Sequence, residues 1–493
     1  MSRTPVQRNR VTWLALTFGC ALGCFVFLWS DRTCLALQGE ELGFLGTPQD
    51  APSAEDRQQI IKFLVSEIDN LTPGDLGANA EHENLIRQAV SAFIDGSERD
   101  AMDWLERFRK VNAESPPIPL MLAAMYFAVG NAVDGMQHLE DAALVNPGLP
   151  TIYNAFARVA ISQQRRTDAL VLLDKSKQLI DAGSWSELQR QHFLTAYYDA
   201  HADLMILRRD FSNARRALSQ LAQLKGDLPR VPLRLAEIAF ELENLDEALV
   251  HLAEFRRMVP EAHVPEIMLA TLFARRGAMQ EAEVWLSRAQ TKYVGDSRVA
   301  LEYIDFMVNR EKFDLANQSI AAVEKEFGVL PAVNLLKGKL AFAEERYAEA
   351  EALFAELYQS DPQNFEVANL LALALVESDR ADKVAQALRQ AQMNVQRQPN
   401  NAVACAILGL VYWKQGNLEQ AGGWLNRAGQ AGQLTPEVGF IFARFLSSRA
   451  EYDKALEILN GALQHQGLFL YRRAASALRD MLANQIQSES GRK

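Results

Sequence analysis

The chain has 493 residues, of which 49% are hydrophobic and 23% are charged, and its formal net charge is −11 at pH 7. A half-apolar chain with only 17 prolines has enough apolar surface to fold, so global disorder is excluded. The acidic balance disfavours nucleic-acid binding, because attraction to phosphates supplies most of the non-specific affinity. Four cysteines are too few for a disulfide framework or a zinc ribbon.

Residues 11–30 form an apolar run that predicts a transmembrane anchor. Val11–Trp29 carries no charge and is about as long as a bilayer core requires. Three arginines precede the run, so the basic tail 1–10 is expected in the cytoplasm and the rest outside it. Two alternatives remain open: a cleaved signal peptide, or a lipoprotein signal that would use Cys24. All three place the body of the protein extracytoplasmically, in the periplasm if the source is bacterial.

Residues 31–81 are expected to form a linker that contains one amphipathic helix at 53–71. The segment 31–52 is rich in glycine, proline and acidic residues and shows no sustained period. The helix is indicated by apolar residues at helical spacing, which are Ile60, Ile61, Leu64, Ile68 and Leu71. We expect this helix to pack near the element that follows it.

Residues 82–467 consist of similar units, and eight of the ten steps between them are 34 residues long. Each unit predicts two amphipathic helices joined by a tight turn. The units begin near His82, Pro116, Pro150, Thr195, Pro229, His263, Ser297, Pro331, Phe365, Ala402 and Pro436.

Small residues stand where the two helices of a unit must touch. On the second helix this residue is alanine in nine of eleven units, and a larger side chain there would overpack at a cost of about 1–3 kcal/mol. The alanines are Ala101, Ala169, Ala214, Ala248, Ala282, Ala316, Ala350, Ala421 and Ala455. On the first helix the matching site is also small in most units, as at Gly338, and a large apolar residue such as Phe354 follows the second-helix site.

The 34-residue frame with these small positions resembles the tetratricopeptide repeat, a helix–turn–helix unit that stacks into a right-handed superhelix. The resemblance covers roughly residues 82–469. It implies an all-α, right-handed α-solenoid of about eleven repeats, here preceded by one N-terminal transmembrane helix.

The resemblance also implies a groove for a protein partner, lined by residues of the first helices. Carried over to this sequence, the groove residues include Asp199, Asp203, Glu237, Phe240, Glu241, Asp305, Leu373, Leu410 and Trp413. The acidic members lead us to expect a partner segment, extended or helical, that is apolar with basic residues.

Two steps break the frame, at an insertion near 177–194 and at three extra residues before Ala402. Ser184 with Glu187 predicts a capping box that opens a lengthened first helix. The insertion is either a longer helix wedged into the stack or a protruding contact element that displays Trp185. At the other end, residues 468–493 are expected to form a capping helix and tail, which a repeat array needs to cover its last apolar face.

No motif of enzymatic chemistry occurs in the sequence. It has no HExxH, CxxC, GxSxG or glycine-rich phosphate loop, and its seven histidines are scattered. We therefore expect no catalytic residue, no metal, no cofactor and no small-molecule substrate.

The expected function is that of a membrane-anchored scaffold that holds protein partners of an extracytoplasmic assembly or secretion complex. An anchor followed by such repeats also resembles the lipopolysaccharide assembly protein B family, which implies the alternative of a regulator of lipid or polysaccharide export. That family ends in a paired CxxC metal module, and this sequence has none.

Overall fold

The computed structural model describes residues 54–74, 77, 79–226, 228–378, 380–431 and 434–490. Within these ranges the chain forms 24 helices and no strand, so the prediction of an all-α solenoid is confirmed. None of the described helices is both long and apolar enough to cross a bilayer. The predicted tail 1–10 and anchor 11–30 lie outside the described residues.

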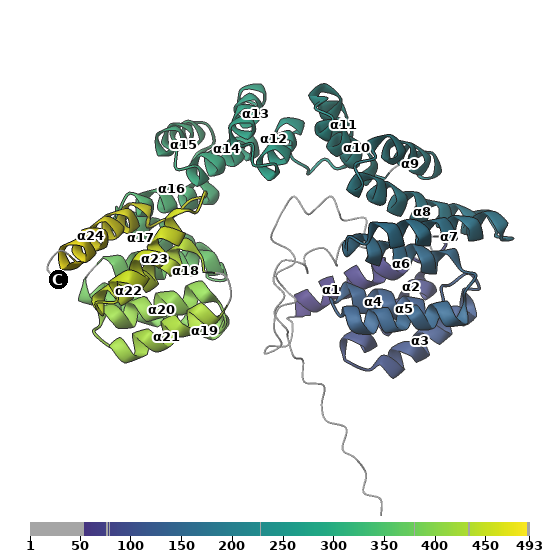
Figure 1. The fold of residues 1–493 in the computed structure, drawn as a ribbon, viewed down its shortest axis with the longest axis horizontal. Helices are drawn as coiled ribbons and strands as arrows, with labels where there is room; N and C mark the ends of the chain where they lie inside the picture. Colours follow the sequence, from purple (N-terminus) through teal and green to yellow (C-terminus); the bar gives the residue numbers. More distant parts are fainter. Residues whose placement is uncertain are drawn as a thin grey trace, which may run out of the picture. The chain divides into compact units, whose positions relative to one another are not determined.

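The chain divides into two compact units, the first ending at Pro265 and the second beginning at Glu266 (Figure 1). The first unit contains α1 (Ala54–Asp69), α2 (Ala80–Ile94), α3 (Glu98–Val111), α4 (Ile118–Ala128), α5 (Ala132–Val145), α6 (Pro150–Ser162), α7 (Arg166–Ala182), α8 (Glu187–Leu207), α9 (Phe211–Leu224), α10 (Arg230–Glu241) and α11 (Leu245–Met258).

The second unit contains α12 (Pro265–Arg275), α13 (Met279–Lys292), α14 (Ser297–Asn309), α15 (Phe313–Phe327), α16 (Pro331–Ala343), α17 (Tyr347–Ser360), α18 (Phe365–Glu377), α19 (Ala381–Arg397), α20 (Ala402–Lys414), α21 (Leu418–Gln430), α22 (Pro436–Ser448), α23 (Tyr452–Leu463) and α24 (Arg472–Ser490). From α2/α3 to α22/α23 the helices follow one another as pairs, one pair to each predicted repeat.

The turn inside ten of the eleven helix pairs has the same backbone geometry. In ten of the pairs the second residue after the first helix has a positive φ, and it is glycine in only four of them. These residues are Gly96, Gly130, Gln164, Arg209, Glu243, Gly277, Glu311, Glu345, Gly416 and Ala450. The next N–H then donates back to a carbonyl five residues earlier, as Asn131 does to Tyr126 at 2.9 Å. This is a Schellman-type ending, which satisfies carbonyls that the last helical turn leaves unpaired.

The helix starts are fixed by residues that the first turn favours. Asn131, Asn244, Asn401 and Asn417 each accept a hydrogen bond from a backbone N–H in the first turn of the helix that follows. Proline opens α6, α16 and α22, where its missing N–H costs nothing.

The contact between the two helices of a pair depends on the small residues. All nine repeat alanines, from Ala101 to Ala455, have no exposed surface. In the α16/α17 pair, a Cβ atom added to Gly338 would lie only 2.4 Å from a ring carbon of Phe354. Phe354 is the only phenylalanine at this position of the second helices, and it packs against Gly338. The larger side chain on α17 fills the space that the missing side chain on α16 leaves.

Two predictions about helix starts were wrong. The capping box before α8 is formed by Ser186 and Gln189, not by Ser184 and Glu187, because α8 begins at Glu187 itself. The predicted lengthening of the first helix of this repeat is confirmed, since α8 has 21 residues. The C-terminal helix begins at Arg472, and residues 468–471 are not helical.

Candidate partner-binding faces

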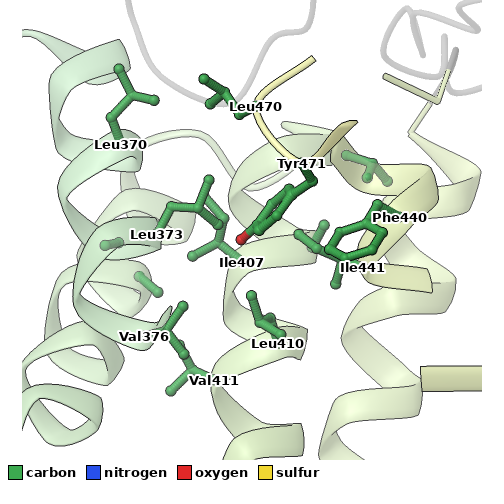
Figure 2. Packing of buried hydrophobic residues seen from close by; sticks show 14 of the residues in the cluster. Leu370, Leu373, Val376, Ile407, Leu410, Val411, Phe440, Ile441, Leu470 and Tyr471 are labelled. Atoms are coloured by element: carbon green, nitrogen blue, oxygen red, sulfur yellow. The ribbon is translucent and has the colours of Figure 1, made fainter. Parts of the chain in front are cut away.

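In the second unit, the first helices of successive repeats form one apolar surface. Its central residues are Leu373 on α18, Ile407 and Leu410 on α20, and Phe440 on α22, and all are at most 3% exposed. Figure 2 shows these side chains converging from neighbouring helices. We call this surface, together with Phe342 on α16, the apolar face.

The apolar face is covered by a non-helical stretch of the same chain, Phe469–Tyr471. The ring of Tyr471 lies 4.6 Å from that of Phe440 and 5.2 Å from that of Phe342, centroid to centroid. Phe469 packs edge-on against Phe440 at 6.4 Å. Leu470 and Tyr471 stand among the labelled side chains in Figure 2. The three residues are 1–9% exposed, so this stretch is bound like a core element although it lacks regular structure.

Three glutamates hold the backbone and the polar ends of this stretch. Glu311 Oε1 accepts hydrogen bonds from the Phe469 N–H at 3.2 Å and from Arg472 Nε at 2.5 Å. Glu437 Oε1 accepts from the Leu470 N–H at 3.2 Å. Carboxylates thus satisfy two backbone donors that a non-helical stretch leaves open, and one of them also binds the following arginine.

The third glutamate, Glu377, lies at the centre of a buried polar cluster. Its Oε1 accepts from Tyr471 Oη at 2.8 Å and from Arg444 Nη1 at 2.5 Å, and its side chain is 5% exposed. Burial disfavours the charge of Arg444, but the Glu377 carboxylate outweighs this and raises the pKa of Arg444. Burial and the same carboxylate also raise the pKa of Tyr471, so its hydroxyl remains a donor.

Of the groove residues predicted in this unit, two belong to the apolar face and two lie elsewhere. Leu373 and Leu410 are buried in it. Trp413 is half-buried, donates from Nε1 to Ser448 Oγ at 3.1 Å, and has the Arg444 guanidinium 5.2 Å from its ring centroid. Asp305 is exposed and accepts a hydrogen bond from Asn309 at 2.8 Å.

In the first unit, the predicted groove residue Asp199 is buried among arginines. Arg158 Nη2 donates to one of its carboxylate oxygens, and Arg234 Nη1 donates to the other at 2.6 Å. Arg230 Nε lies 3.0 Å from the same oxygen as Arg234. Burial opposes ionisation of Asp199, but the charges of Arg234 and Arg158 outweigh it and lower the pKa of this carboxyl.

The other predicted acidic residues of this unit are accompanied by arginines as well. Asp203 accepts from Arg234 Nη2 at 3.1 Å, and Glu241 accepts from Arg209 Nη2 at 2.8 Å. Phe240 is buried, and Glu237 is half-buried. The expectation of an acidic groove at Asp199 is therefore wrong, because it counted the carboxylates and overlooked the arginines of the neighbouring helices.

Trp185 lies against the stack and is not displayed on the insertion. Its Nε1 donates to the carbonyl of Leu179 at 3.0 Å, and its ring packs edge-on against Phe193 with centroids 5.1 Å apart. Phe193 is itself buried in the core of α6–α10. The structure thus supports the wedged helix and contradicts the protruding contact element.

The residues that hold the Phe469–Tyr471 stretch were not predicted from the sequence. Glu311 stands in the turn between α14 and α15, outside the carried-over groove positions, whereas Glu377 ends α18 as the predicted residue Glu241 ends α10, and it was missed. A usable signal was the run Phe469-Leu470-Tyr471, whose consecutive large apolar residues fit no single helix face.

One family model and several solved structures are similar to parts of this chain. Residues 341–398 match the tetratricopeptide repeat family, whereas no curated protein matches the chain. A tetratricopeptide repeat protein from Parabacteroides merdae has 12% identity, a TM-score of 0.40 and coverage of 52% of this chain and 98% of its own. Pseudomonas aeruginosa pilF has 16% identity and a TM-score of 0.32, with 45% of this chain and 96% of its own covered. Yeast Tom70 has 13% identity and a TM-score of 0.32, with 83% and 96% covered.

The chain is therefore an α-solenoid built of paired helices, and residues 341–398 carry the tetratricopeptide repeat itself. Within the described ranges no group of three or more His, Cys, Asp or Glu side chains is placed to hold a metal ion. Among the described residues, the two candidate sites are the apolar face of the second unit and the arginine cluster around Asp199.

Proposed function

We propose that this protein is a non-catalytic scaffold that binds a segment of a protein partner on the apolar face of its second unit. The observation that carries the proposal is the bound state of Phe469–Tyr471. A non-helical peptide stretch already lies on this face, with its side chains buried and two of its backbone N–H groups accepted by Glu311 and Glu437. A surface that holds one such stretch has the chemistry to hold another.

The contacts of that stretch define the chemistry of the partner. Two aromatic side chains fill the apolar face, and the basic residue that follows them binds Glu311. We therefore propose a partner segment with aromatic or large aliphatic residues followed by arginine or lysine. This keeps the expected apolar and basic character but places the recognising carboxylates at Glu311 and Glu377, because Asp199 is neutralised.

A partner of this kind would exchange with residues 469–472 of the scaffold itself. The tethered stretch acts at an effective concentration in roughly the millimolar range. A partner must therefore bind more tightly than a free copy of the stretch, or bind while the C-terminal helix α24 is displaced.

We further propose that the scaffold is anchored in a membrane through residues 11–30 and works on the extracytoplasmic side, as part of an assembly or secretion complex. The proposal is supported by the uncharged run Val11–Trp29 and by the arginines that precede it. Protease treatment of intact cells or sealed vesicles tests it. The protease should cleave the repeats only when it has access to the extracytoplasmic face of the membrane. Cleavage by a protease added to the cytoplasmic face would contradict the proposed extracytoplasmic location of the repeats.

Site-specific photo-crosslinking in native membranes tests partner binding. A photoreactive residue replaces Leu370 on α18, which belongs to the same buried cluster as Leu470 and is labelled with it in Figure 2, and the matched control replaces the exposed Gln386 on α19. Combined with Tyr471→Ala, the first position should capture a discrete protein, and Gln386 should not. Equal capture from both positions, or none from Leu370 in a folded variant, would argue against a partner on this face.

A further inference from the structure

A partly enclosed cavity of about 130 Å³ lies in the first unit, between the end of α1 and the helices α6, α8 and α10. Its volume is well above the roughly 10–15 Å³ that one water molecule needs. The polar lining includes Asn154, Arg158, His192, Lys225, Arg230 and Arg234. The cavity is separate from the apolar face, so a ligand bound in it is independent of the function proposed for that face.

The charges around the cavity favour an anion. Four cations line it, namely Arg158, Lys225, Arg230 and Arg234, against the carboxylates of Asp69 and Asp199. Among the residues that line the cavity this is an excess of two positive charges; Asp203 and Glu237, which interact with Arg234, lie outside the lining.

The arginines of the cavity are also largely withdrawn from water, since the side chains of Arg158, Arg230 and Arg234 are only 12–14% exposed. Asp199 is shared among all three of them. Burial and the neighbouring charge of Arg234 lower the pKa of Arg230 to about 10. A low-dielectric site strengthens the attraction between these cations and an anion that enters it.

Two further polar groups of the lining have no hydrogen-bond partner among the described residues. Asn154 is 2% exposed, and neither its Nδ2 nor its Oδ1 is bonded. The Nε2 atom of His192 is likewise buried and unbonded. Buried amides almost always have partners, so an unbonded asparagine in a cationic cavity indicates a ligand that can accept from Nδ2.

We propose that this cavity is a binding site for one compact oxyanion of the phosphate type. Its oxygens would accept from the Asn154 amide and face the guanidinium groups of Arg158, Arg230 and Arg234, which suit the geometry of tetrahedral and planar oxyanions. The anion is either free phosphate or a phosphoryl group carried on a larger molecule, since the chemistry at the cavity is the same for both.

Isothermal titration calorimetry of the full chain in detergent, at constant ionic strength, tests the site. Inorganic phosphate should bind with a stoichiometry of one, and saturating phosphate should raise the Tm by at least about 5 °C at a hundredfold excess over Kd. A parallel titration with O-phosphoserine distinguishes the sources. Binding of phosphate alone assigns a free anion, whereas binding of both assigns a carried phosphoryl group. Absence of saturable binding for both ligands overturns the proposal.

Three variants and one control separate the site from general charge effects. Lys225→Gln, at an exposed position, and Arg230→Gln should each weaken phosphate binding at least about tenfold. Asn154→Leu should abolish binding yet raise the Tm in phosphate-free buffer, because it removes an unbonded buried amide. Arg109→Gln, on the exposed side of α3, should bind like the wild type. If Lys225→Gln and Asn154→Leu, both folded, bind phosphate as tightly as the wild type, the site does not exist.

Discussion

Replacing Gly338 by alanine tests how the two helices of a repeat achieve contact. The added Cβ would lie 2.4 Å from one ring carbon of Phe354 and 2.9 Å from two others, whereas carbon atoms in contact are about 3.5–4.0 Å apart. Phe354 is fully buried, so its ring cannot move outward without disturbing the core. We take the upper end of the overpacking range, about 3 kcal/mol. Alanine regains about 1 kcal/mol of helix propensity, which leaves a net loss of about 2 kcal/mol.

The compensating change is Phe354→Leu, which recreates the alanine–leucine pairing seen at Ala236 and Leu252, both without exposed surface. In a double-mutant cycle measured by urea unfolding, the two substitutions should show a favourable coupling of about 3 kcal/mol, because the helix-propensity gain of alanine is the same in both backgrounds and cancels. The matched control is Gly461→Ala on α23, where nothing lies within 4 Å of the added Cβ. It should stabilise the protein by about 0.5–1 kcal/mol. If Gly338→Ala stabilises the protein as Gly461→Ala does, the reasoning about this contact is wrong.

Two further predictions concern the turns and the buried carboxyl of Glu67. Ala450 has φ 59°, so Ala450→Gly should stabilise the second unit by up to about 1 kcal/mol. Gly130 has φ 80°, so Gly130→Ala should destabilise the first unit by a similar amount. Urea unfolding measures both changes, and a change of the same sign for the two variants would contradict the strain argument. Burial raises the pKa of Glu67 from 4.5 to about 8, against the opposing charge of Arg158. Between these two pH values the folded state keeps a proton that the unfolded state releases. The free energy of unfolding of the wild type therefore falls as the pH rises from 4.5 to 8. Glu67→Gln should therefore gain stability over the wild type with rising pH, by up to about 3 kcal/mol at pH 7; a difference that stays constant between pH 5 and 7.5 would refute the assignment.

The repeat architecture was predictable because its determinants are local. A small residue at one position, a large apolar residue four positions later and a step of 34 residues are visible along the sequence, and they fix which helices pair. The turn geometry was harder to predict, since Glu345 and Ala450 adopt a positive φ, which is uncommon for glutamate and alanine.

The candidate sites were only partly predictable because they depend on how repeats stack. Asp199 binds Arg158, which lies 41 residues earlier, and Arg234, which lies 35 residues later. Neither separation equals the 34-residue repeat step, so the repeat pattern does not predict these ion pairs. Arg472 reaches Glu311 across 161 residues. That contact requires the second unit to curve so that its last repeat faces its earlier ones, and no local pattern specifies the curvature.

The most direct test of the central claim is whether the apolar face binds a peptide supplied from outside. A fluorescent peptide with the sequence of residues 467–474 is titrated, with anisotropy as the readout, into the full chain carrying Phe469→Ala and Tyr471→Ala. We predict saturable binding with a stoichiometry of one, at least tenfold weaker binding to the wild type, and weaker binding when Glu377→Gln is added. If the opened variant is folded by circular dichroism and still does not bind the peptide, the apolar face is only a packing surface for the C-terminal segment, and the proposed function is contradicted.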